Sequence, residues 1–168
     1  MLAGTRSDMD TSRKIQVSTV IDAPAADIFA LLSDPDRHTD LDGSGMLRGL
    51  VAGQPLLAIG QTFTMDMHQD AFGDYRMVNA VTAFVPDARI GWEPHMDPGC
   101  ELASKLDGMQ VGGHTFTFDL REVDGGTEVT ETYDWMSVKD EKFLEMLPVV
   151  SEDDLRGSLA RIERAVAG

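Results

Sequence analysis

The chain has 168 residues, a length that favours one domain with a substantial buried core. Its 14 basic and 29 acidic residues give a net charge of −15, which repels nucleic acid and anionic membranes and excludes both as expected partners. Cys100 is the only cysteine, so an internal disulfide and a multi-cysteine metal site are excluded.

Targeting signals and membrane spans are not recognisable in the sequence. Residues 1–12 lack the apolar core of a signal peptide, and we expect a flexible lead-in there, followed by a single domain over residues 13–168. No apolar run is long enough to cross a bilayer, so membrane insertion is not expected. A single cysteine suits a reducing compartment, and the expected location is the cytoplasm.

A strand and a short helix are predicted near the N-terminus. Residues 13–21 alternate between apolar and polar side chains, as a half-buried strand does. Pro24 then suits the first turn of a helix, because that turn does not need the N–H that proline lacks. The helix is expected to bury its apolar residues, Ile28, Phe29, Leu31 and Leu32.

Six further strands are predicted between clusters of turn residues. Their expected ranges are 46–51, 61–68, 74–85, 88–96, 113–123 and 127–136. In the second of these, Met65 and Met67 share a face with Phe63. Because methionine fills irregular apolar space, this stripe is typical either of an adaptable binding site or of an ordinary core.

Two irregular segments accompany the strands. Residues 36–45 are polar and turn-rich, and they place His38 and Asp42 either in a solvated turn or at the mouth of a pocket. Residues 97–112 form one long insertion, and long loops are more often functional than structural filler. We therefore consider residues 97–112 as a lid.

The last hairpin indicates the register of the sheet. A two-residue turn at Asp124-Gly125 or Gly125-Gly126 gives one aromatic face and one polar face, as expected for an antiparallel sheet with one buried side. The aromatic face is predicted to hold Phe116, Phe118, Leu120, Val129, Tyr133 and Trp135.

The same register brings His114 and Glu131 to the inner face. An ionised carboxylate is costly there unless it is paired or wet. Glu131 therefore lies near a sheet end or has a partner, or else the inner face lines a cavity that contains water. His114 follows two glycines at a strand start, and we expect it to be a solvated histidine at the rim.

The hairpin at Pro86-Asp87 is read as a second two-residue turn. In that register Ile90 and Trp92 share a face with Asn79, Val81 and Ala83. Asn79 would then point inward beside Trp92 and offer a donor and an acceptor to a ligand.

Residues 151–167 predict a long amphipathic helix. Ser151 suits the N-cap, and the three acidic residues after it place negative charge at the positive end of the helix dipole, which stabilises the helix. The helix needs a cover for its apolar stripe, which consists of Leu155, Leu159, Ile162 and Val166.

This order of elements resembles the START-like superfamily (birch-pollen-allergen-like, SRPBCC), in particular its polyketide cyclase/dehydrase branch of actinobacterial type. The resemblance covers roughly residues 13–167 and rests on four short motifs: Asp42-Gly43-Ser44-Gly45, Arg89-Ile90-Gly91-Trp92, Gly113-His114-Thr115-Phe116 and Tyr133-Asp134-Trp135. It implies an α+β helix-grip fold, in which a curved antiparallel sheet of about seven strands wraps around the C-terminal helix, with short helices after the first strand. It also implies a pocket for lipids, polyketides or other apolar molecules.

The expected function is binding of a small apolar metabolite between the sheet and the C-terminal helix, with or without cyclase-type proton transfer. For catalysis, Glu131 is the candidate base and His114 the candidate acid or base, with His38 as an alternative to His114. The expected ligand-binding residues are Met65, Met67, Tyr75, Asn79, Trp92, Phe116, Phe118, Tyr133, Trp135, Leu155 and Leu159.

Two non-catalytic alternatives use the same fold, a carrier or sequestering protein and an interaction module whose pocket is filled by its own side chains. No cofactor is expected, because no phosphate-binding or dinucleotide motif occurs. The four histidines are scattered without helical spacing, so no metal site is expected either. The protein is expected to be a monomer or a homodimer.

Overall fold

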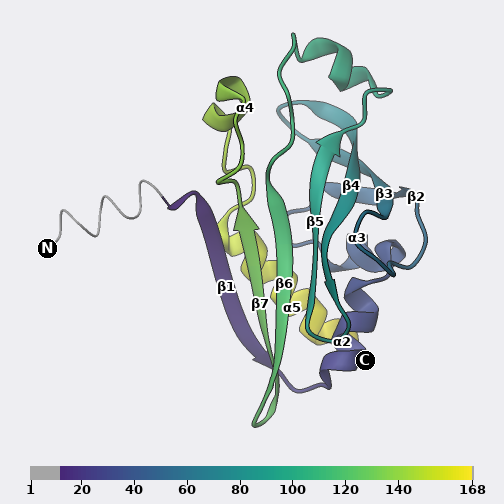
Figure 1. The fold of residues 1–168 in the computed structure, drawn as a ribbon, viewed down its shortest axis with the longest axis vertical. Helices are drawn as coiled ribbons and strands as arrows, with labels where there is room; N and C mark the ends of the chain where they lie inside the picture. Colours follow the sequence, from purple (N-terminus) through teal and green to yellow (C-terminus); the bar gives the residue numbers. More distant parts are fainter. Residues whose placement is uncertain (1–11, 168) are drawn as a thin grey trace, which may run out of the picture.

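The structure, a computed structural model, describes residues 12–167. The predicted lead-in over residues 1–12 lies outside the described residues, except for Ser12. The described chain has the α+β architecture expected from the sequence, an antiparallel seven-stranded sheet with the long helix α5 (Glu152–Ala167) on one face (Figure 1).

The strands follow the order β1-β7-β6-β5-β4-β3-β2 across the sheet. Each predicted strand is present, with ends that differ from the prediction by no more than two residues. The bounds are β1 Lys14–Ile21, β2 Leu47–Ala52, β3 Thr62–Gln69, β4 Gly73–Val85, β5 Arg89–Met96, β6 Thr115–Val123 and β7 Gly126–Asp134.

Short helices lie around the sheet. The helix α2 (Ala25–Leu32) buries Ile28, Phe29, Leu31 and Leu32 as predicted. The turn-rich segment after it forms a 3-10 helix η1 (Pro35–Arg37) and one turn of α-helix, α3 (His38–Leu41). A second 3-10 helix, η2 (Glu101–Lys105), and the helix α4 (Glu141–Glu145) lie at the same end of the sheet (Figure 1).

The helix α5 runs behind the sheet in Figure 1 and begins with a reciprocal cap. Ser151 Oγ accepts from the backbone N–H of Asp154 at 3.0 Å, and the Asp154 carboxylate accepts from the N–H of Ser151 at 3.0 Å. This arrangement satisfies two backbone donors and confirms the predicted cap. Of the predicted stripe, Leu155, Leu159 and Ile162 are buried and Val166 is partly buried.

The last hairpin has the predicted register. Asp124 and Gly125 form the turn, Phe118 pairs with Glu131, and Leu120 pairs with Val129. The aromatic face therefore points toward α5, and the threonine-rich face points outward. Exposed hydrogen bonds such as Gln16 Nε2 to Thr132 Oγ1, at 2.9 Å, lie on that outward face.

The β4–β5 hairpin differs from the prediction near its turn. The turn contains three residues, 86–88, so Phe84 pairs with Ile90 and Ala83 pairs with Gly91. Phe84 consequently takes the inward place that was predicted for Ala83, and its ring packs 5.4 Å from that of Phe29. A bulge between Val81 and Ala83 then restores the predicted pairing from Val81 onward.

No helix among the described residues is long and apolar enough to cross a membrane.

Candidate functional site

A cavity of about 190 Å³ lies between the inner face of the sheet and α5. A single water molecule needs only about 10–15 Å³ of such space, so the core is not filled by its own side chains. The walls come from strands β2 to β7, from the helices α2 to α5, and from the insertion after β5. Apolar side chains dominate the lining, and a few polar groups interrupt it.

Most of the predicted site residues line this cavity. They are Met65, Met67, Tyr75, Asn79, Trp92, His114, Phe116, Phe118, Glu131 and Leu155. Apart from His114, which lies just before β6, these residues belong to five strands and one helix. The curved sheet therefore brings together side chains that are distant in sequence.

Tyr133, Trp135 and Leu159 do not line the cavity, although each was predicted to bind ligand. The ring of Tyr133 stacks on Phe116 with centroids 4.7 Å apart and planes 8° apart, so Phe116 provides the cavity wall at this place. The hydroxyl of Tyr133 accepts from the N–H of Val149 at 3.3 Å. The ring of Trp135 packs 5.0 Å from that of Tyr133, and Leu159 is buried in the hydrophobic core.

Glu131 is buried within β7, opposite Phe118 on one side and Val17 on the other. Its side chain is 5% exposed, and its Oε1 atom has no hydrogen-bond partner. Neither a sheet end nor a protein partner explains this carboxyl group, whereas the adjoining cavity does. Burial, with the negative charge of Asp42 adding to it, raises the pKa of Glu131 to about 8. At neutral pH the group is mostly protonated.

His114 is buried, not solvated at the rim as predicted. Its side chain is 4% exposed, because the ring of Phe143 from α4 packs 5.3 Å away. Its Nδ1 atom has no hydrogen-bond partner. Burial, and to a smaller extent the nearby His95, lowers the pKa of His114 to about 4. The imidazole is therefore neutral at pH 7.

Glu131 and His114 do not form an acid–base pair. Phe118 is the partner of Glu131 in the sheet, and His114 lies four residues before Phe118. At about 3.3 Å per residue, this separation is roughly 13 Å. A ligand of sufficient length could contact both groups, but a proton cannot pass directly between them.

His38 and Asp42 line the cavity. Of the two interpretations of residues 36–45, a position at the pocket therefore holds, and a solvated turn does not. His38 donates from Nε2 to the carbonyl of Leu32 at 2.7 Å, and its ring stacks on Trp92 with centroids 4.7 Å apart. Burial lowers the pKa of His38 to about 4, against the effect of the Leu32 hydrogen bond.

The carboxylate of Asp42 is held by its own loop. Its Oδ1 accepts from the N–H and the hydroxyl of Ser44, at 2.9 and 2.6 Å, and its Oδ2 accepts from the N–H of Leu47 at 3.0 Å. These three bonds fix the position of the negative charge at the cavity wall. Asp42 also raises the pKa of Tyr75, after the larger effect of burial, to about 12.

A close contact of two glycines fastens the Asp42 loop to α5. The N–H of Gly43 donates to the hydroxyl of Ser158 at 2.9 Å. A Cβ atom on Gly43 would lie 2.5 Å from the backbone nitrogen of Ser158, so only glycine fits there. Gly157 faces Gly43 across this contact. Sequence analysis missed the contact, although glycines in both the loop and the helix were visible.

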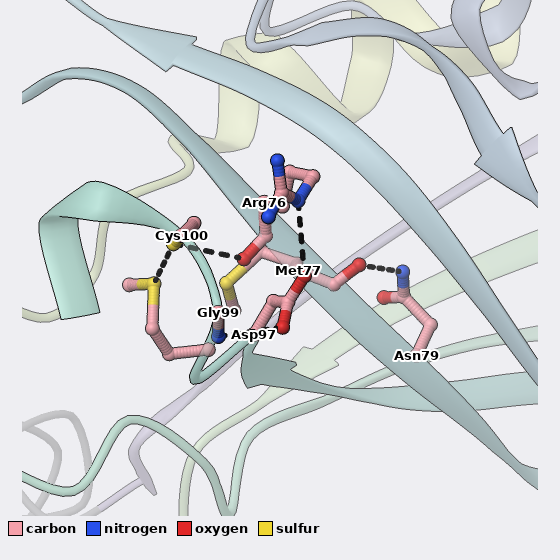
Figure 2. A network of polar contacts seen from close by, with 7 residues as sticks. Arg76, Met77, Asn79, Asp97, Gly99 and Cys100 are labelled. Atoms are coloured by element: carbon pink, nitrogen blue, oxygen red, sulfur yellow. Dashed lines mark hydrogen bonds and ion pairs between the residues drawn. The ribbon is translucent and has the colours of Figure 1, made fainter.

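The insertion after β5 covers the cavity with apolar side chains, those of Leu102, Leu106, Met109 and Val111. Its base is fixed to β4, as Figure 2 shows. Asp97 accepts from Arg76 Nε at 2.9 Å and from the N–H of Gly99 at 2.9 Å, and the Cys100 thiol lies 3.9 Å from the carbonyl of Arg76. At its other end, the N–H of Gln110 donates to the carboxylate of Asp140, beside α4, at 2.8 Å.

Within residues 12–167, no group of three histidine, cysteine, aspartate or glutamate side chains is placed to hold a metal ion. Among the described residues that line the cavity, the polar side chains include those of Asp42, Glu131, the two histidines, and several neutral residues with amide or hydroxyl groups.

Proteins of known sequence and structure resemble this chain. It is 32% identical to the uncharacterized protein Rv0088 of Mycobacterium tuberculosis over 126 residues, which are 74% of this chain and 46% of that protein. The chain thus spans about half the length of the curated relatives that it matches.

Solved structures share the fold along nearly the whole chain. Protein Ms6760 from Mycobacterium smegmatis has a TM-score of 0.67 at 17% identity, and the match covers 95% of this chain and 94% of that one. Protein CV1439 from Chromobacterium violaceum has a TM-score of 0.64 at 16% identity, and the match covers 93% of this chain and 98% of that one.

A family model described as "Activator of Hsp90 ATPase homolog 1-like protein" matches residues 22–164. The matched region runs from the turn after β1 into the last turns of α5, so it contains every wall of the cavity. The chain therefore belongs to the family of Activator of Hsp90 ATPase homolog 1-like proteins, within the START-like superfamily that its sequence resembles.

Proposed function

We propose that this protein binds a small apolar metabolite, polyketide-like or lipid-like, in the cavity between the sheet and α5. The observation that carries the proposal is an apolar cavity whose wall contains two buried polar groups without partners, Glu131 and His114. Nearly all buried polar atoms in proteins have a hydrogen-bond partner. A ligand with polar atoms at two places would supply the missing partners.

Among the alternatives, a carrier or sequestering protein is the form of this proposal that needs no catalytic group. The interaction module with a filled pocket is disfavoured by the volume of about 190 Å³. Binding sites for small molecules are concave, mostly apolar and supplied with a few fixed polar groups, as this cavity is.

Proton-transfer chemistry of the cyclase or dehydratase type is a second candidate function. It is favoured by Glu131, whose pKa of about 8 lets the carboxyl group gain or lose a proton near neutral pH. The change Glu131→Gln separates the two functions, because it retains the size and a hydrogen-bond donor but cannot transfer a proton. A carrier would keep its ligand and its transfer activity, whereas an enzyme would bind the same ligand and lose turnover.

The proposal is tested by native mass spectrometry of the purified protein together with binding of the neutral dye Nile red. We expect an apolar molecule to co-purify, or Nile red to bind with one site per chain. Met67→Trp, which fills the cavity wall, should abolish the binding. Met136→Trp is the matched control, because Met136 is 58% exposed and lies outside the cavity. Nile red binding that both variants retain would contradict the proposal.

A further inference from the structure

The cavity has a charge pattern that selects among apolar ligands. We propose that it takes an uncharged apolar molecule whose carbonyl oxygen accepts a hydrogen bond from Glu131, and that it rejects the corresponding carboxylate anion. The inference rests on the proposed function and specifies the chemical class of ligand for the same site.

The first argument is the absence of a cation along the wall. No lysine or arginine lines the cavity within the part of the chain that the structure describes. Both histidines that line it, His38 and His114, are neutral at pH 7 because burial lowers the pKa of each to about 4. A buried carboxylate of a fatty acid would therefore have no positive partner, and an unpaired buried charge is strongly unfavourable.

The second argument is the negative charge of Asp42. This carboxylate is fixed by three hydrogen bonds within its loop, so it cannot turn away from the cavity. Its charge already favours the protonated form of Glu131. The same field would oppose an anionic head group bound beside Glu131. A ligand ammonium group would be attracted by this charge. It would, however, lose its hydration on entering, and the three bonds to Asp42 leave about one acceptor site on the carboxylate to replace it.

The third argument concerns donors and acceptors. The amide nitrogen of Asn79 donates to the carbonyls of Phe63 and Met77, at 3.3 and 3.4 Å. Asn79 therefore offers a ligand its amide oxygen, which is an acceptor, and no free donor. Protonated Glu131, in contrast, has a donor O–H, and its Oε1 atom has no hydrogen-bond partner among the described residues. A carbonyl oxygen on the ligand satisfies that donor without adding charge.

Among the titratable groups around the cavity, Glu131 is the one that gains or loses a proton near pH 8. The others that line the same cavity are His38 from α3, Asp42 from the following loop, Tyr75 from β4 and His114 just before β6. On its own strand, Tyr133 has its pKa raised to about 12, as has Tyr75. The two α5 residues at the cavity, Leu155 and Ser158, do not titrate in this range.

The experiment is isothermal titration calorimetry of three probes of equal chain length, 2-decanone, decanoate and decylamine. At pH 7 we expect 2-decanone to bind at least tenfold more tightly than either charged probe. Raising the pH to 9 should weaken 2-decanone binding about tenfold, because Glu131 then loses the proton it donates. Glu131→Gln should retain binding at pH 7 and remove the pH effect, since its amide donates at both pH values.

Glu128→Gln is the matched control, because Glu128 lies on the same strand with its side chain paired to Arg121 at 2.8 Å on the outer face. This variant should keep the full pH effect. Equal or tighter binding of decanoate or decylamine would overturn the inference and leave the proposed function intact, and so would a pH effect that persists in Glu131→Gln. If no probe binds at either pH, the proposed function itself fails, and this inference fails with it.

Discussion

Glu131 has an energetic effect on folding as well as a place in the cavity. Its pKa rises from 4.5 to about 8 on folding, because burial disfavours the charged form. Between these two pH values the unfolded chain has lost the proton while the folded chain still holds it. The free energy of unfolding therefore decreases as the pH rises from about 4.5 to 8, and stays at its reduced level above 8.

We predict that Glu131→Gln stabilises the protein by an amount that grows as the pH rises above about 4.5 and is complete above pH 8. Glutamine removes the cost of ionising a buried group. The rise in the pKa of Glu131 from 4.5 to about 8 corresponds to a gain in unfolding free energy on the order of 5 kcal/mol at pH 9. At pH 4 the two proteins should be nearly equally stable. Urea denaturation at pH 4, 6.5 and 9 measures this, with Glu128→Gln on the outer face as the control. A stability difference that is the same at all three pH values would contradict the assignment.

Single residues were predicted unevenly from the sequence. The inner positions of Glu131, Asn79 and Trp92 follow from strand alternation, which only needs a correct register. The burial of His114 could not be derived in this way, because its cover is Phe143, and α4 is a short helix with little periodicity of its own. Contacts between elements far apart in sequence decide such positions.

Elements and their pairing were more predictable than the turns that join them. Asp124-Gly125 forms the expected two-residue turn, since an Asp-Gly pair accepts the backbone conformation of a tight hairpin. Pro86-Asp87 resembles a similar turn, yet Asp87 adopts a φ of 61° within a three-residue turn. The bulge after Val81 compensates, so the face of Asn79 was predicted correctly although the turn was wrong.

The contact of the Asp42 loop with α5 leads to a prediction about two facing glycines. Gly43→Ala should destabilise the protein by roughly 3 kcal/mol, because the new Cβ would lie 2.8 Å from the carbonyl carbon of Gly157 and push the loop from the helix. Gly157→Ala is the matched control, since its Cβ would make an ordinary contact 3.4 Å from Gly43 Cα, and alanine favours the helix. Urea denaturation should show a loss in the first variant and no loss in the second. An equal loss in both would contradict the proposed packing.

At the scale of the whole molecule, the sheet, α5 and the insertion together enclose a cavity that none of them closes alone. The sequence predicts this enclosure because the apolar stripe of α5 and the aromatic face of the sheet each need a cover. It does not predict the volume that remains. That volume depends on how far the insertion and α4 lie from the sheet, and short elements of this kind carry weak sequence signals.

The buried ionisable groups together predict a maximum in stability near pH 6.5. The pKa values of His38 and His114 are about 4 in the folded protein, against 6.5 for an ordinary histidine. Between these two pH values, the unfolded chain binds protons at both histidines and the folded chain does not. Their contribution to stability is therefore complete above pH 6.5 and is lost as the pH falls toward 4. Below pH 9, Glu131 acts in the opposite direction, because its contribution to stability is lost between pH 4.5 and 8.

Below pH 6.5 the destabilisation from the two histidines exceeds the stabilisation from Glu131. Above pH 6.5 the destabilisation from Glu131 exceeds the small gain that the histidines still supply. We expect the free energy of unfolding to fall by about 2 kcal/mol from pH 6.5 to 4.5, and by about 1 kcal/mol from pH 6.5 to 8. Denaturation at a series of pH values measures this curve. His114→Gln should flatten the stability curve on its acid side, and Glu131→Gln should flatten it on its alkaline side. Each change removes one group whose proton uptake differs between the folded and the unfolded chain. His68→Gln, a change at a partly exposed histidine outside the cavity, should leave the maximum where it is. A curve that rises or falls steadily across this range would show that these groups do not remain buried and uncharged in the folded protein.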